Sequence, residues 1–177
     1  MLFNSYIFIF VFLPLTLGSY YGLHKLGKPV FAKIALILMS FWFYGYFNPN
    51  YLWIMCSSII VNYLLSQLLQ RKWEMSAAQI AVLKKSLLAI GLIFNLGLIF
   101  YFKYYDFFVD NLNKVFSTDF QLKNIVLPLG ISFFTFQQVS YMVDSYRGET
   151  KEYNFADYAL FVTFFPQLIA GPIVLHN

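Results

Sequence analysis

The sequence predicts an all-α, polytopic transmembrane protein with about six apolar segments. Hydrophobic residues make up 60% of the 177 residues and charged residues only 11%, whereas soluble domains average about 25% charged residues. The charged residues are also clustered, so that long uncharged runs separate them. Because a transmembrane helix needs roughly 20 consecutive apolar residues, most of these runs are long enough to span a bilayer. Such a chain lacks the polar residues to cover a soluble surface.

Five uncharged runs define the segments, and they cover residues 1–24, 34–70, 86–102, 124–143 and 158–177. The second run is long enough for two spans, and Asn48-Pro49-Asn50 in its middle is a turn signal. The expected segments are therefore 5–23, 30–47, 51–70, 86–105, 124–144 and 156–175. The chain has no internal repeat or long linker, so we expect residues 1–177 to form a single transmembrane domain.

The loops differ in their content of Lys and Arg. If the spans alternate, the loops at 24–33, 71–85 and 144–157 place nine Lys and Arg on one side, against three on the other. Cytoplasmic loops carry the excess of these residues, which predicts a multi-pass protein with its N-terminus outside the cytoplasm. The first segment has no basic residue before it, unlike a signal peptide, and we expect it to remain as a helix. No dense basic patch predicts a nucleic-acid partner.

Residues 103–116 combine a charged face with an apolar face at helical spacing. The charged residues are Lys103, Asp106, Asp110 and Lys114, and the apolar face contains Tyr104, Phe108, Leu112 and Val115. The pattern predicts an amphipathic helix that lies in the membrane interface or continues the fourth segment into water. Asp110 and Lys114 are expected to form an ordinary pair one helical turn apart.

Polar and small residues recur at helical spacing in the third and fourth segments. The third segment has Ser58, Asn62 and Ser66 four residues apart, and the fourth has Gly91 and Asn95. Such residues usually hydrogen-bond to neighbouring membrane helices and let them approach closely. We expect them to hold helices together, with a substrate path as the alternative. The single cysteine, Cys56, is expected to be a small core residue.

The fifth segment has a helix breaker near its start, at Leu127-Pro128-Leu129-Gly130. Unpaired backbone groups at such a break are tolerated in a membrane where protein or a water-filled cavity covers them. Polar groups at a broken helix often mark a binding site. The alternative is that the proline only marks the membrane interface, with an acidic loop residue beside Arg147. The candidate substrate-path residues of this segment are Ser132, Gln137, Tyr141 and Asp144, the last three sharing one helix face.

The sixth segment contains two prolines, in Phe164-Phe165-Pro166-Gln167 and in Ala170-Gly171-Pro172-Ile173. Two prolines at this spacing interrupt a regular helix, so we expect a kink or a re-entrant end. Gln167 and His176 complete the candidate substrate-path residues. A histidine this close to the last residue is more often a solvated interfacial group than a catalyst.

Three stretches resemble one known family. They are Met1 to Phe8 with Phe12-Leu13-Pro14, residues 127–137 followed by Asp144 to Gly148, and Phe164 to Ile173. In this order and at similar intervals they resemble the membrane-bound O-acyltransferase (MBOAT) superfamily, in its alginate O-acetyltransferase and D-alanyl-transfer branch. The second and third stretches are fairly specific, and the first is suggestive.

The resemblance implies a multi-pass enzyme of the inner or plasma membrane, longer than this chain. Such enzymes transfer an acyl group, commonly acetyl, to a hydroxyl of an extracellular or cell-wall polysaccharide. The catalytic histidine of the family lies downstream of the glycine-proline motif and therefore beyond Asn177. The resemblance thus implies that this chain is an N-terminal portion without a catalytic residue, and that it is inactive alone.

The resemblance also implies the partners. The acyl donor, acetyl-CoA or a carrier-linked acyl group, is a substrate on the cytoplasmic side, where an acyl-carrier protein is an expected partner. The acceptor is an extracytoplasmic polysaccharide or a periplasmic or extracellular acetylation partner, and no bound cofactor or metal is expected. The alternatives are a transporter or channel subunit and a non-catalytic scaffold. Ion pathways usually place charged groups inside spans, and the centres of the expected spans are uncharged.

Overall fold

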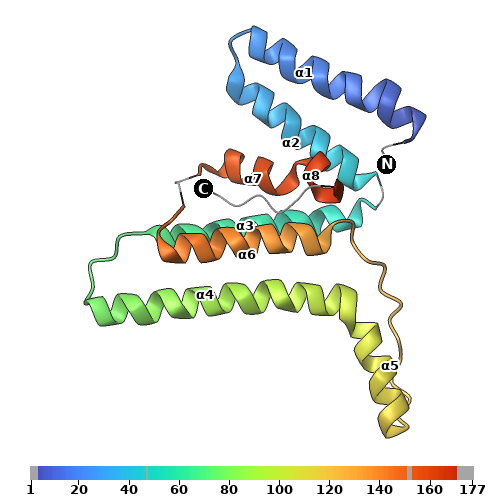
Figure 1. Ribbon diagram of the computed structural model, residues 1–177, viewed down its shortest axis with the longest axis vertical. Helices are drawn as coiled ribbons and strands as arrows, with labels where there is room; N and C mark the ends of the chain where they lie inside the picture. The colour runs from blue at the N-terminus through green and yellow to red at the C-terminus, as the bar shows by residue number, and fades with distance from the viewer. Residues whose placement is uncertain (1–3, 47, 151–152, 171–177) are drawn as a thin grey trace.

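The computed structural model describes residues 4–46, 48–150 and 153–170, and within this part of the chain it contains helices and no strand (Figure 1). The all-α prediction is therefore confirmed for these residues. The helices are η1 Phe8–Phe12, α1 Leu13–Lys25, α2 Pro29–Gly45, α3 Asn50–Gln70, α4 Ala77–Ile99, η2 Phe100–Tyr104, α5 Tyr105–Phe116, α6 Ile131–Arg147, α7 Phe155–Thr163 and α8 Phe165–Ala170. The two η elements are π-helical turns that continue directly into the next α-helix.

The helices alternate in direction, and α6 lies at the centre of their contacts. It packs against α3 and α4 on one side and contacts α7 and α8 on another, while α1 packs on α2. In Figure 1, α3, α4 and α6 run nearly side by side, and α5 bends away from the end of α4. The ends of α1, α3 and α6 therefore lie at the same end of the bundle as the starts of α2, α4 and α7.

The bundle buries uncharged polar side chains and exposes large apolar ones. Asn62 and Asn95 are completely buried, whereas Trp53 is 79% exposed and Ile93 is 71% exposed. This arrangement suits helices surrounded by lipid, because lipid tails do not penalise exposed apolar side chains. By length and composition, two helical stretches of the described chain qualify as membrane spans, 50–70 and 77–116, and α2 is a shorter apolar helix. Six spans are not established by this criterion.

The start of the fourth segment differs from the prediction. The expected loop at 71–85 is wrong, because α4 begins at Ala77 and only residues 71–76 connect it to α3. Ser76 caps α4: its Oγ accepts from the Gln79 backbone N–H at 3.4 Å, and the Gln79 side chain accepts from the Ser76 N–H at 3.3 Å. The Ser-x-x-Gln spacing is a helix-start signature. The two lysines at 84–85 were wrongly taken as loop residues; long lysine side chains can reach water from within a helix.

The fifth segment is helical only in part. The predicted helix at 124–144 is wrong for its first residues, because α6 begins at Ile131. Gly130 precedes it with φ +67°, a left-handed conformation that glycine adopts without strain. The expected break at the proline is thereby confirmed. At the other end α6 continues to Arg147, so Asp144 lies in the helix and not in a loop.

Two further predictions concern breaks and amphipathic character. Phe164 interrupts the sixth segment with non-helical backbone (ψ 106°), so α7 and α8 are separate helices and the expected kink is confirmed. The second proline motif beyond Ala170 lies outside the described residues. The amphipathic helix is confirmed as α5, in which Lys114 and Asp110 form an ion pair at 2.6 Å. The predicted turn before α3 is confirmed by Asn48, whose Oδ1 accepts from the Asn50 N–H at 3.0 Å.

Candidate functional site

A buried network of amide side chains joins α3, α4 and α6. Asn62 donates from Nδ2 to Gln138 Oε1 at 2.5 Å, and Asn95 donates from Nδ2 to Asn62 Oδ1 at 2.6 Å. Ser58 Oγ also donates to Gln138 Oε1, at 2.7 Å. All four residues are fully buried. The predicted hydrogen bonding between helices is confirmed for Ser58, Asn62 and Asn95 but not for Ser66, whose hydroxyl has no partner among the described residues. Their partner Gln138 was not predicted.

Gly91 allows α4 to approach α6 closely. A Cβ atom placed on Gly91 would lie 2.1 Å from Sδ and 2.4 Å from Cε of Met142, a residue that is itself fully buried. The Gly91 carbonyl accepts from Asn95 Nδ2 at 2.8 Å, which fixes the amide toward α3. Small residues at such crossings bring hydrogen-bonding groups on different helices within reach of one another.

A second polar cluster lies where α3 and α6 end. Gln70 Nε2 donates to Ser145 Oγ at 3.0 Å and reaches the Tyr141 hydroxyl at 3.4 Å. Ser145 in turn donates to the Tyr141 carbonyl at 2.7 Å. Tyr141 is fully buried, and its ring lies 4.8 Å from that of Tyr158 on α7. The predicted path residue Tyr141 is therefore held between α3 and α7.

Eight buried polar side-chain atoms have no hydrogen-bond partner within the described part of the chain. Four are the hydroxyl oxygens of Ser40, Ser66 and Thr135 and the amide nitrogen of Gln138. The other four come from large side chains outside the amide network, and we call them the unpartnered set: Tyr44 Oη, Gln137 Oε1, Tyr158 Oη and Gln167 Nε2. Gln137 is 4% exposed, and both tyrosines are 1% exposed or less. A buried polar group without a partner costs about 1–3 kcal/mol. Such atoms are ready to bind a polar group of a substrate or of another protein segment.

The predicted path residues fall into different places. Ser132 is half-buried, and at 100° per residue it points about 140° away from Gln137 on the same helix. Asp144 is half-buried near the far end of α6, and among the described residues it forms no ion pair with Arg147. Twelve residues at 1.5 Å rise separate Ser132 from Asp144 by about 18 Å. Only Gln137, Tyr141 and Gln167 place polar atoms in the buried region, and His176 lies outside the described residues.

Neither tyrosine of the unpartnered set was selected from the sequence. Tyr44 and Tyr158 belong to the same core cluster as Tyr141, together with apolar side chains from α2, α3, α6 and α7. Tyrosine is common where a membrane helix meets the headgroups, so a tyrosine in an apolar run carries no specific signal. The two tyrosines are buried because α7 packs against both α2 and α6.

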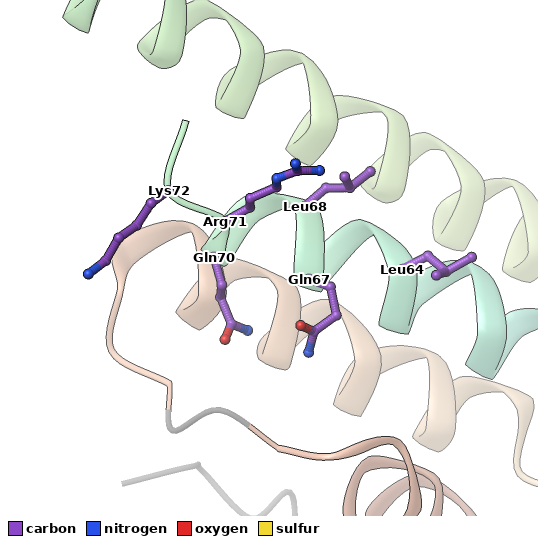
Figure 2. Close-up of a pocket in the computed structure, with 6 residues that line it drawn as sticks. All are labelled: Leu64, Gln67, Leu68, Gln70, Arg71 and Lys72. Carbon is purple, nitrogen blue, oxygen red and sulfur yellow. The ribbon is translucent and has the colours of Figure 1, made fainter. Parts of the chain in front are cut away.

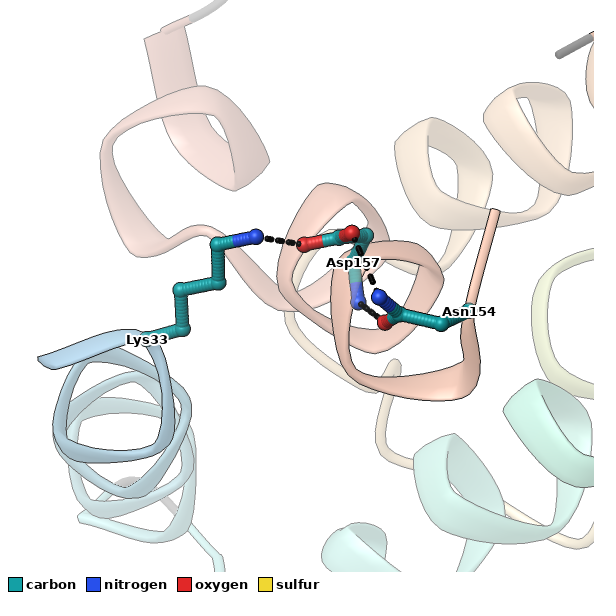
Figure 3. Close-up of polar contacts among 3 residues, drawn as sticks. All are labelled: Lys33, Asn154 and Asp157. Carbon is teal, nitrogen blue, oxygen red and sulfur yellow. Dashed lines mark hydrogen bonds and ion pairs between the residues drawn. The ribbon is translucent and has the colours of Figure 1, made fainter. Parts of the chain in front are cut away.

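An ion pair connects the starts of α2 and α7. Lys33 Nζ lies 2.5 Å from Asp157 Oδ1, and Asn154 fixes the same carboxylate by donating to Oδ2 at 2.8 Å (Figure 3). Asn154 also caps α7, because its Oδ1 accepts from the Asp157 N–H at 2.9 Å. Both charged residues were expected in loops on the same side of the membrane, and the contact agrees with that arrangement.

The possible metal ligands of the described part of the chain include one histidine, His24. No group of three or more His, Cys, Asp or Glu within this part of the chain is arranged to hold a metal ion. His24 is exposed in the last turn of α1, with its ring 6.1 Å from that of Tyr20. Figure 1 places that end of α1 away from α6.

Several bacterial proteins match this chain along nearly its whole length. It is 38% identical to a peptidoglycan O-acetyltransferase of Helicobacter pylori over 203 aligned positions, which include 100% of this chain and 37% of the relative. It is 35% identical to the probable alginate O-acetylase AlgI of Pseudomonas aeruginosa, covering 98% of this chain and 33% of the relative. The chain is a homologue of these O-acetyltransferases. The resemblance inferred from its motifs is thereby confirmed.

A further homologue is the probable alginate O-acetylase AlgI of Azotobacter vinelandii, with 35% identity over 98% of this chain and 34% of the relative. The chain thus spans about a third of the length of the curated relatives that it matches. No family model matches the chain. No solved structure matches it either.

Proposed function

We propose that the protein is a membrane-bound O-acyltransferase that transfers an acyl group to hydroxyls of a cell-envelope polysaccharide. The proposed acyl group is acetyl. The observation that carries the proposal is the 32–38% identity, along nearly all of this chain, to proteins named peptidoglycan O-acetyltransferase and alginate O-acetylase. The bundle with polar groups inside and apolar side chains outside supports the membrane location.

Within this enzyme, the described helices would form one wall of the path along which a substrate reaches the reacting centre. The unpartnered set supports this role, because its four polar atoms are buried and available for hydrogen bonding. Acyl transfer to an alcohol needs a base that accepts the hydroxyl proton and donors that stabilise the oxyanion. We assign to Gln137 and Gln167 the binding of substrate, and to a histidine outside this chain the role of base.

The proposed orientation places the basic end of the bundle in the cytoplasm of the inner or plasma membrane, with the N-terminus outside. Lys33 and Asp157 at this end support one common side for the starts of α2 and α7. The donor, acetyl-CoA or an acyl group on a carrier protein, would approach from that side as a substrate and not as a bound cofactor. The acceptor polysaccharide, or a partner that passes the group to it, would approach from the other side.

The test is acetyl transfer by the whole protein in a host strain that lacks its own O-acetylation. Ester-linked acetate is released by mild alkali from purified peptidoglycan and from exopolysaccharide, and each fraction is quantified. We expect acetate above the vector control in one of the two fractions. Its absence from both, with the protein present in the membrane at normal level, would refute the proposed activity.

The role of this chain is tested by Gln137→Leu in the same assay. Because Gln137 Oε1 has no partner among the described residues, the substitution removes no hydrogen bond seen there and should leave the unfolding temperature unchanged or higher. We expect transfer to fall about tenfold, which corresponds to one lost substrate hydrogen bond of about 1.4 kcal/mol. Full activity of this variant would show that the residue does not line the path.

A further inference from the structure

An open groove lies at the end of α3, where the helix leaves the apolar part of the bundle. Its volume is about 570 Å³, and its lining residues are Leu64, Gln67, Leu68, Gln70, Arg71 and Lys72 (Figure 2). The groove therefore changes along its length from leucine to amide to cationic side chains. In the view of Figure 2, Leu64, Leu68 and Arg71 lie on the side of α3 toward α4.

The two cations of the groove are free to bind an anion. Within the described residues, neither Arg71 nor Lys72 forms an ion pair with a carboxylate. The Arg71 guanidinium lies over the Trp73 ring, 4.8 Å from its centroid, and the indole Nε1 donates to the Leu68 carbonyl at 3.2 Å. These contacts fix the indole and the guanidinium beside the groove. Tryptophan is enriched at the depth of the lipid headgroups.

The apolar part of the groove lies about two helical turns from its cations along α3. Leu64 is 55% exposed although it belongs to a span-forming helix. Seven residues at 1.5 Å rise place it about 10 Å below Arg71 along the helix axis. A ligand that satisfies both ends must have a negative head and an apolar tail at this spacing.

We propose that this groove binds an anionic phospholipid, with the phosphate at Arg71 and Lys72 and an acyl chain against Leu64 and Leu68. The inference rests on the membrane location in the proposed function, and it does not depend on acyl transfer. Charge complementarity decides the occupant, because two cations without an ion pair among the described residues, next to an exposed leucine, match an anionic lipid better than a zwitterionic one. Each Lys or Arg at a membrane surface contributes about 1 kcal/mol of attraction to anionic lipids.

The experiment measures binding of phosphatidylglycerol and of phosphatidylcholine with the same chains to the whole protein in detergent, by native mass spectrometry. We expect a preference for phosphatidylglycerol that falls about 30-fold in the double variant Arg71→Gln, Lys72→Gln, since each of the two cations contributes about fivefold. The matched control is Lys25→Gln with Lys28→Gln, which removes two cations from the same end of the bundle but away from the groove.

Three results would overturn the proposal. The first is an equal loss in the control variant, which would indicate general attraction to the basic end. The second is displacement of the lipid by millimolar inorganic phosphate, which would assign the cations to a free anion. The third is unchanged binding in Leu64→Trp, a substitution at an exposed position that fills the apolar part of the groove. A lipid preference without any acetyl transfer would refute only the proposed activity.

Discussion

The contact between Gly91 and Met142 makes a sharp prediction for Gly91→Ala. Alanine normally stabilises a helix by about 1 kcal/mol relative to glycine. Here the added Cβ would lie 2.1 Å from Met142 Sδ and 3.3 Å from a Leu65 methyl group. A methionine side chain is flexible, but Met142 is fully buried and has little free space. We therefore expect α4 and α6 to separate slightly and the substitution to be destabilising.

The size of the effect follows from two contributions. Overpacking a buried contact costs about 1–3 kcal/mol. Separation of the helices also weakens the hydrogen bond between Asn95 and Asn62, and interhelical hydrogen bonds in membranes average about 0.6 kcal/mol. After the helix-propensity gain of about 1 kcal/mol is subtracted, the net loss of unfolding free energy is about 0.5–2.5 kcal/mol.

The assay is equilibrium unfolding of the purified protein in detergent, with Gly97→Ala as the matched control. Gly97 lies on the same helix, and nothing lies within 4 Å of an added Cβ there. The control should therefore be neutral or stabilising. The double variant Gly91→Ala, Met142→Ala should lose less stability than the sum of the two single variants, because the shortened side chain removes the clash with the added Cβ. If Gly91→Ala were as stable as the control, the close approach of α4 and α6 would be disproved.

Two further predictions concern polar side chains. Asn62→Leu removes a buried side chain that bonds to both Gln138 and Asn95, so we expect a loss of about 1–3 kcal/mol; exposed Ser57→Ala is the control, and equal stabilities would argue against the network. Asp144→Leu should lower acetyl transfer about tenfold with normal membrane insertion if the Asp144 carboxylate contacts a substrate. Transfer at the level of the wild type would place Asp144 outside the path, and Arg147→Gln controls for a change of charge in the same turn.

Much of the fold was predictable because it depends on local signals. Uncharged runs located the helices, and the prolines at 128 and 166 located the breaks at the start of α6 and between α7 and α8. The predicted start of α4 was wrong because Lys84 and Lys85 were taken to mark a loop, and the capping signature of Ser76 and Gln79 was not used. A capping box is decided by backbone hydrogen bonds, whereas a lysine on a helix end can extend its ammonium into water.

The site was less predictable, because it depends on which helices become neighbours. Periodicity showed that Asn62 and Asn95 each point from one face of a helix, but it did not show that Gln138 lies between α3 and α4 as their partner. It also gave no reason to select Tyr44 or Tyr158, whose burial results from the packing of α7. Partner choice across a bundle is a tertiary property, and residue spacing within one helix carries no information about it.

Hydrogen-bond satisfaction separates the two roles that polar residues play around α6. The amides of Asn62 and Asn95 and the Gln138 Oε1 atom bond to one another and hold α3, α4 and α6 together, although Gln138 Nε2 has no partner among the described residues. The unpartnered set lies on α2, α6, α7 and α8, where the buried polar atoms gain nothing from the described packing. Because the interior of a membrane bundle offers little water to such groups, retaining them is reasonable only where another molecule or segment binds. The side of α6 toward α7 and α8 is therefore where a substrate contact should be sought first.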